Sequence, residues 1–96
     1  MPGDMRLVQI ARMLAVPLPE LTPASAAALI AARPADMADA IFHEAADSDD
    51  VTGSEAAREY LEARLAFFGE LAPPGAAEAI RAGFRERIGA WDSSAG

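Results

Sequence analysis

Abundant alanine, interrupted by prolines, restricts this chain to short helices. Alanine has the highest helix propensity of the amino acids, and it recurs throughout the 96 residues. Runs of the β-branched and aromatic residues that favour strands do not occur. Helices are expected to begin or end at the prolines, because proline removes a backbone donor and clashes with the preceding turn. The sequence therefore predicts an all-α fold, a compact bundle of four or five short helices.

The expected helices cover residues 5–16, 23–32, 34–46, 55–71 and 76–91. Asp4, Thr22 and Ser54 stand immediately before three of them, and their side chains suit the N-cap position. A composition that is 52% apolar fits one small core in a chain of this length. Residues 1–91 are therefore expected to form a single helical domain, and residues 92–96 a disordered tail.

A short internal similarity suggests how the helices are connected. Glu20-Leu21-Thr22-Pro23 is followed by Ala26 and Ile30, and Glu70-Leu71-Ala72-Pro73 is followed by Ala76 and Ile80. An alanine-rich chain also produces such matches by chance. If the match is structural, each segment ends one helix and starts the next, which favours two helical hairpins joined by the third helix.

The charge of the chain is concentrated in one segment. The net charge is −7, and seven acids but no lysine or arginine lie between Arg33 and Arg58. The other eight acids are balanced by the eight arginines. A local negative field steers positively charged partners, so Asp47, Asp49 and Asp50 are candidate contacts for a protein partner with a basic surface. The alternative is that these acids only keep the protein soluble.

Few residues are available for catalysis or for holding a cofactor. The chain has no cysteine and no lysine, and His43 is its single histidine. His43 lies one helical turn from Asp39, an arrangement that suits a metal or proton site but more often an exposed ion pair. The segment 48–59 resembles a calcium-binding loop only in part, with Ser48 in place of the first acid and Glu55 at an apolar position. We expect no cofactor, no structural metal, and weak or absent binding of divalent cations.

Membrane and nucleic-acid partners are not expected. The longest uncharged stretch, residues 21–32, is shorter than the roughly 20 residues of a membrane span, and no secretory signal is recognisable. We therefore expect a soluble, cytoplasmic protein. Residues 8–16 match the first helix of a helix-turn-helix motif, but the second helix is mostly alanine and the net charge opposes approach to phosphate.

The fourth helix carries an unusually broad apolar face with one arginine in its middle. Arg64 must meet an acid, cap a helix or lie at a subunit boundary, because burying an unpaired guanidinium is very costly. We expect a two-fold dimer in which this helix pairs with its copy. The alternative is a partner within the chain, with Asp36, Asp39 or Glu78 as candidates. The candidate interaction residues on this helix are Tyr60, Arg64, Phe67, Phe68 and Leu71.

These observations favour a small acidic helical protein that acts by association with another protein, as an adaptor, regulator or accessory subunit, and not as an enzyme. A helix-turn-helix DNA-binding regulator is the first alternative. A carboxylate-based or metal-dependent enzyme is the second.

Overall fold

The computed structural model describes the backbone of residues 4–95 and the side chains of residues 4–90. It contains five α-helices: α1 (Met5–Leu14), α2 (Pro23–Ala32), α3 (Pro34–Asp47), α4 (Ser54–Phe68) and α5 (Pro74–Ala95). Two short 3₁₀ turns, η1 (Leu18–Glu20) and η2 (Gly69–Leu71), precede α2 and α5. The described residues contain no strand, and the all-α prediction is confirmed.

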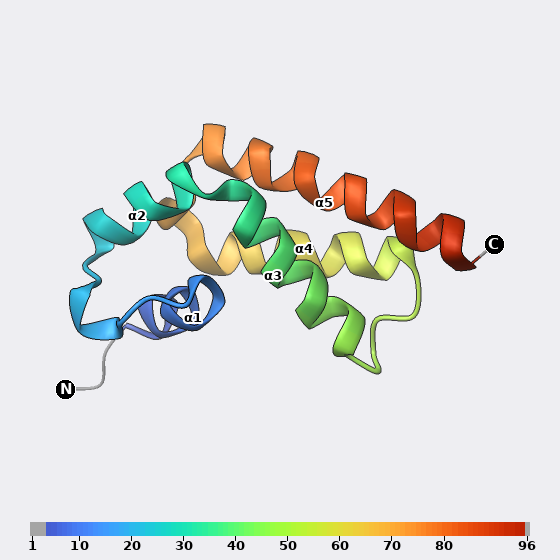
Figure 1. Cartoon of the computed structure of the whole chain (residues 1–96), viewed down its shortest axis with the longest axis horizontal. Helices are drawn as coiled ribbons and strands as arrows, with labels where there is room; N and C mark the ends of the chain where they lie inside the picture. Colours follow the sequence, from blue (N-terminus) through green and yellow to red (C-terminus); the bar gives the residue numbers. More distant parts are fainter. Residues whose placement is uncertain (1–3, 96) are drawn as a thin grey trace.

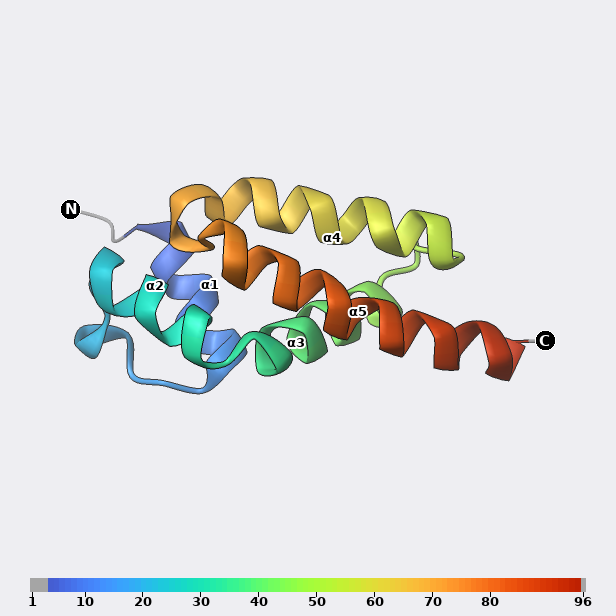
Figure 2. The same ribbon diagram turned by 90° about the horizontal axis from the view of Figure 1, so that it is seen from above.

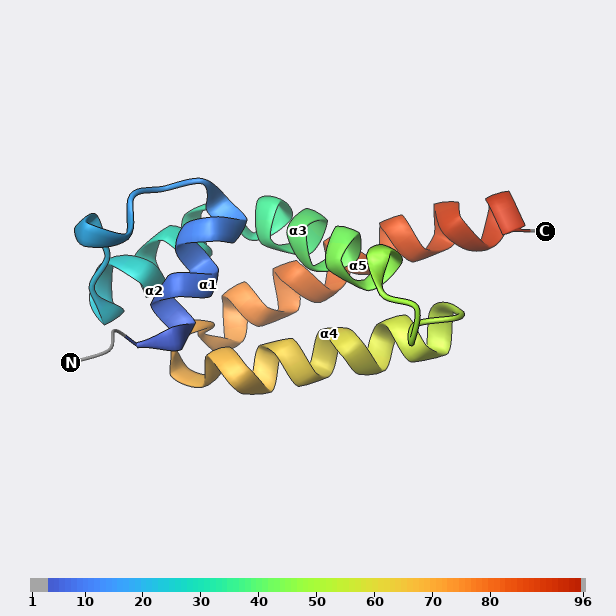
Figure 3. The same ribbon diagram turned by 90° about the horizontal axis from the view of Figure 1, so that it is seen from below.

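The helices form an elongated bundle that measures 45 × 26 × 20 Å. Helices α4 and α5 run antiparallel along its length, and α3 packs against both of them (Figures 1 and 2). Helix α1 crosses the end of the bundle where α4 finishes, and α2 lies at the same end (Figure 3). The loop between α3 and α4 lies at the opposite end, beside the C-terminal part of α5.

A regular spacing of apolar residues builds the core. Residues three or four apart share one face of a helix, and the buried side chains follow that spacing in every α-helix. The spacing of Ile80, Phe84, Ile88 and Trp91 in the sequence predicts one apolar stripe. The first three are fully buried on α5, and the side chain of Trp91 lies outside the described part. The larger core residues of the other helices are Ile10, Leu14, Ile30, Met37, Ile41, Leu61, Leu65 and Phe68.

Helices α3 and α5 form the most extensive contact in the bundle, and a glycine permits their close approach. A Cβ added at Gly83 would lie 3.1 Å from the Cβ of Ala38, closer than ordinary van der Waals contact. The two small residues therefore face each other where the helices cross. Gly83 lies in the middle of α5, where glycine lowers helix propensity, so helix packing explains its position.

Two of the three predicted N-caps are present. Asp4 Oδ1 accepts a hydrogen bond from Arg6 N at 2.9 Å. Thr22 Oγ1 accepts from Ser25 N at 3.1 Å while Ser25 Oγ accepts from Thr22 N at 2.8 Å, which is a reciprocal capping box. The prediction that Ser54 caps α4 is wrong. Ser54 is already the first helical residue, and the extended Gly53 before it has no side chain to cap with.

The predicted ends of the last two helices were wrong by a few residues. Helix α4 stops at Phe68, three residues early, because Gly69 adopts a left-handed φ of 56° that ends the regular hydrogen bonding. Helix α5 starts at Pro74, since proline suits the first helical position. It continues to Ala95, so the helix extends into the segment predicted as a disordered tail, of which Gly96 lies outside the described residues.

The internal similarity corresponds to a repeated local structure. In both places Glu-Leu lies in or directly after a 3₁₀ turn, a proline begins the next helix, and the matched alanine and isoleucine are buried. Only α4 and α5 form an antiparallel hairpin, however. Figure 1 shows α1 nearly end-on while α2 lies in the plane of the view, so the first pair forms a corner. Eight residues connect α1 to α2 and let the chain change direction there.

Candidate functional site

The acidic segment divides into a neutralised part and an unpaired part. Each acid in the body of α3 faces an arginine from elsewhere in the chain: Asp36 with Arg33 at 2.7 Å, Asp39 with Arg87 at 3.2 Å, and Glu44 with Arg64 at 3.5 Å. The remaining four acids of the segment have no ion pair among the described residues. They are Asp47, Asp49, Asp50 and Glu55, all exposed, in the loop and at the helix ends that adjoin it. We call this region the acidic end.

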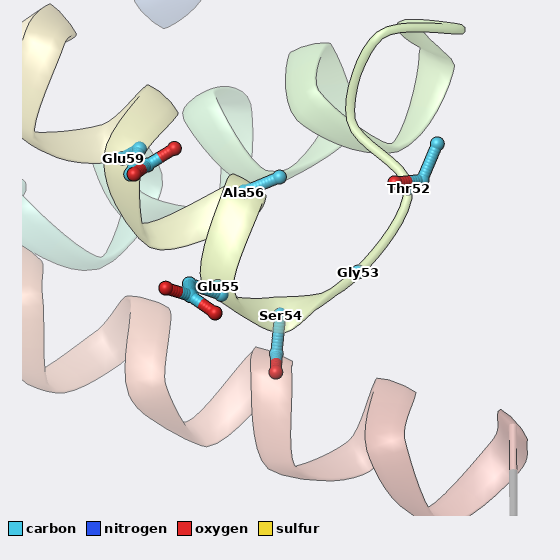
Figure 4. Close-up of a pocket in the computed structure, with 6 residues that line it drawn as sticks. All are labelled: Thr52, Gly53, Ser54, Glu55, Ala56 and Glu59. Atoms are coloured by element: carbon cyan, nitrogen blue, oxygen red, sulfur yellow. The ribbon is translucent and has the colours of Figure 1, made fainter.

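The acidic end does not assemble into a cation cage. A shallow depression of about 430 Å³ lies at the start of α4. Figure 4 shows that the side chains around it, which include Thr52, Glu55 and Glu59, point in different directions. Ser48 Oγ, the first position of the calcium-loop template, accepts a hydrogen bond from Asp50 N at 3.3 Å. Residues 4–90 contain no group of three or more histidine or acidic side chains placed to hold a metal ion. Weak or absent cation binding stays a prediction.

His43 forms the ion pair that the sequence suggested. Its Nε2 lies 3.4 Å from Asp39 Oδ1, and the histidine side chain is 68% exposed. Asp39 also accepts a hydrogen bond from Arg87 Nε at 3.2 Å, so this carboxylate is shared between two groups. The arrangement is that of an exposed surface pair on α3.

Arg64 finds its partners within the chain. Its Nη2 donates to Gln9 Oε1 of α1 at 3.3 Å, and its Nε lies 3.5 Å from Glu44 Oε1 of α3. The guanidinium carbon also lies 5.1 Å and 5.2 Å from the ring centres of Phe67 and Phe68. The buried Nε makes no hydrogen bond with the described residues. This side of the guanidinium is therefore held by its attraction to Glu44 and by its contact with the two phenylalanine rings.

The three intrachain partners proposed from the sequence for Arg64 were wrong. Asp36, Asp39 and Glu78 each pair with another arginine, and none of them contacts Arg64. The correct acid, Glu44, lies on α3 beside α4. No sequence spacing relates positions 44 and 64, because the contact arises from the crossing of two helices.

Tyr60 belongs to the same cluster. Its hydroxyl donates to Glu44 Oε1 at 3.0 Å, so one carboxylate bridges Tyr60 and Arg64. Burial raises the pKa of Tyr60, and the negative charge of Glu44 and its hydrogen bond raise it further. The cluster of Gln9, Glu44, Tyr60 and Arg64 ties α1, α3 and α4 together and is largely covered.

Two of the five interaction residues proposed for the fourth helix lie in the core, and Tyr60 and Arg64 are partly buried. Phe68 is fully buried and Leu71 is 2% exposed, so both are core residues and their assignment to a binding surface was wrong. The sequence argument assumed too few helices to cover both sides of α4, whereas α1 crosses one side and α3 and α5 cover the rest. Phe67 is the exception, with 41% of its area exposed. The other exposed large apolar side chains in the described part are Met5 and Leu18.

The structure reveals two arginines that cap helix ends. Arg33 Nη1 donates to the carbonyl of Leu14 at 3.1 Å, and Arg6 Nη1 donates to the carbonyl of Phe68 at 3.5 Å. Both carbonyls are at helix C-termini, where a positive charge complements the partial negative charge of the helix end. The sequence carries no signal for these contacts, because each joins segments far apart in the chain.

A second groove lies between α4 and α5. It has a volume of about 180 Å³ and is lined by Arg58, Leu61, Glu62, Glu78, Arg81 and Arg85. Arg81 donates to Glu62 through Nε at 2.8 Å and through Nη2 at 2.9 Å, and it also pairs with Glu78. The hydrogen bond from Arg81 lowers the pKa of Glu62. Arg58 and Arg85 have no ion pair or hydrogen bond through their side chains within the described part of the chain.

No helix in the described part of the chain is both long and apolar enough to cross a membrane. Within residues 4–95 even α5, the longest helix, is too rich in charged residues to span a bilayer. A comparison of the chain with protein-family models, curated proteins and solved structures finds no match.

Proposed function

We propose that this protein acts by association with another protein, as a small adaptor, regulator or accessory subunit, and that its acidic end contacts a basic surface of the partner. The observation that supports this proposal is the distribution of unpaired acids. The arginines neutralise the three acids in the body of α3 and leave Asp47, Asp49, Asp50 and Glu55 exposed together at one end. A concentrated field accelerates encounter with a positively charged surface and orients it.

No observation favours the alternatives. The described histidine is a surface ion pair, and no histidine or carboxylate group among residues 4–90 is placed to hold a metal ion. Helix α2 presents exposed alanines, and the two side chains at this helix that could read a base edge are engaged elsewhere, Ser25 with Thr22 and Arg33 with the Leu14 carbonyl.

Charge-matched variants test the role of the acidic end. Once a partner is captured from the native host, its association rate is measured over a range of salt concentrations. The triple variant Asp47→Asn, Asp49→Asn, Asp50→Asn is compared with a control that replaces Glu20, Glu70 and Glu86, three exposed acids elsewhere, with glutamine. Both variants have the same net charge. We expect a slower association and a weaker salt dependence in the first variant only.

Two outcomes contradict the proposal. Equal effects in both variants mean that only net charge matters, and unchanged kinetics in the first variant mean that the acidic end serves solubility alone.

The homodimer stays a separate prediction with less support than the sequence suggested. Arg64 meets Glu44 within one chain, so it needs no acid from a second copy. The exposed Phe67 is the remaining argument for pairing through α4. Sedimentation at micromolar concentration decides the matter, since a single 10.0 kDa species excludes the dimer.

A further inference from the structure

Two arginines without acidic partners converge on the groove between α4 and α5. Arg58 comes from α4 and Arg85 from α5, and Leu61, which is 4% exposed, lies between them. Five of the eight arginines pair with an acid among the described residues, and only these two of the other three line a common groove. Both side chains lack an ion pair within the described residues.

The third arginine of the groove is already satisfied. Arg81 is held by two hydrogen bonds to Glu62 and a further pair with Glu78. Its guanidinium is therefore fixed and shapes the wall of the groove. Arg58 and Arg85 keep all their donors available, and the planar fork of each matches the two oxygens of a carboxylate.

We infer that this groove receives a carboxylate-bearing segment of the protein partner. The inference rests on the proposed function, since it describes a second contact with the same partner. Charge complementarity identifies the chemistry: two free guanidinium groups, on opposite helices, accept acidic side chains better than any other group of a protein. The two carboxylates that also line the groove, Glu62 and Glu78, are both paired with Arg81, so the unpaired charges of Arg58 and Arg85 disfavour a basic partner surface there.

The groove and the acidic end then form one contact surface with a positively charged part and a negatively charged part. Arg58 lies one turn along α4 from Glu55 of the acidic end, so positive and negative features adjoin each other. A partner that carries a basic patch beside an acidic segment fits in one orientation, and the reversed orientation places like charges together.

Short charged peptides test the groove without knowledge of the partner. A hexaglutamate peptide is titrated into ¹⁵N-labelled protein, and the side-chain Nε–Hε resonances of Arg58, Arg85 and Arg12 are followed together with the backbone amide of Leu61. Arg12 is the internal control, because it is exposed, has no ion pair within the described residues and lies on α1, which does not line the groove. We expect shifts at Arg58, Arg85 and Leu61 that exceed those at Arg12.

Matched variants define the size of the effect. Arg58→Gln with Arg85→Gln should weaken binding of the glutamate peptide roughly 2- to 30-fold, the range for two exposed charge pairs. Arg12→Gln should leave it unchanged. The inference is overturned if Arg12 responds as strongly as the groove arginines, if the double variant binds as well as the wild type, or if no groove resonance shifts at millimolar peptide. Circular dichroism verifies that the variants are folded.

A hexalysine peptide separates this inference from the proposed function. It should shift the amides of Asp49 and Asp50 in the wild type and equally in the arginine double variant. Shifts with the lysine peptide but not with the glutamate peptide leave the acidic end in place and overturn the groove. The reverse result overturns the acidic end alone.

Discussion

Removing the charge of Arg64 should destabilise the monomer by about 2.5 kcal/mol. The guanidinium donates to Gln9 at 3.3 Å, lies 3.5 Å from Glu44 and contacts two phenylalanine rings. A hydrogen bond to a charged group contributes about 1.5 kcal/mol, and each partly exposed cation–π contact about 0.5 kcal/mol. Arg64→Met keeps apolar packing over the rings but loses the hydrogen bond and the cation–π contacts. Arg64→Ala also removes the stem, so a loss on the order of 3 kcal/mol is expected.

The cost should stay below that of breaking a fully buried ion pair, about 3–5 kcal/mol. Glu44 is not stranded when Arg64 is removed, because its side chain is 25% exposed and Tyr60 still donates to it. A double-mutant cycle of Arg64→Met with Glu44→Gln isolates the charge pair, and we expect a coupling free energy of about 1 kcal/mol.

Urea unfolding followed by circular dichroism measures these differences, and sedimentation measures the mass. Arg85→Met is the matched control, since Arg85 is an exposed arginine on α5 whose side chain has no ion pair or hydrogen bond within the described part, and its effect should stay within about 0.5 kcal/mol. An Arg64→Met variant as stable as this control refutes the reasoning. A variant that keeps its stability but changes from dimer to monomer places Arg64 at a subunit interface.

Three further outcomes are expected. Gly89→Ala should stabilise α5 by about 0.5–1 kcal/mol in urea unfolding, because a Cβ there meets nothing within 4 Å. Gly83→Ala should stabilise the protein less or destabilise it, because its Cβ would lie 3.1 Å from the Cβ of Ala38 on α3. The phenolate absorbance of Tyr60, the single tyrosine, should titrate above its ordinary pKa of 10.0. A raised pKa stabilises the fold below about pH 10 and the contribution is lost as pH rises through the folded value, so Tyr60→Phe should reduce the alkaline loss of stability. The pKa of Glu62 is lowered in the folded state, so this group stabilises the fold above its unfolded pKa of 4.5 and the contribution is lost as pH falls through the folded pKa. Glu62→Gln should therefore make the free energy of unfolding less sensitive to acid. An unchanged acid transition would contradict the role of Arg81.

Features that depend on near neighbours in the chain were predictable from the sequence. The caps at Asp4 and Thr22 and the helix starts at Pro23 and Pro34 are decided within three or four residues. The buried stripe of α5 follows from helical spacing alone. The predicted end of α4 was wrong for a local reason, because Gly69 ends the helix before Pro73 and Pro74 are reached.

The tertiary structure alone decided the candidate sites. Phe67 and Phe68 are adjacent and chemically identical, yet one is 41% exposed and the other fully buried, because the crossing helices cover only one of them. The partner of Arg64 was decided in the same way, since α3 brings Glu44 to it across 20 positions of the chain. The sequence determines how many acids the chain carries, but which of them remain unpaired depends on where folded helices place the arginines. Ion pairs act through space over a few ångströms, and only the packed bundle sets those distances.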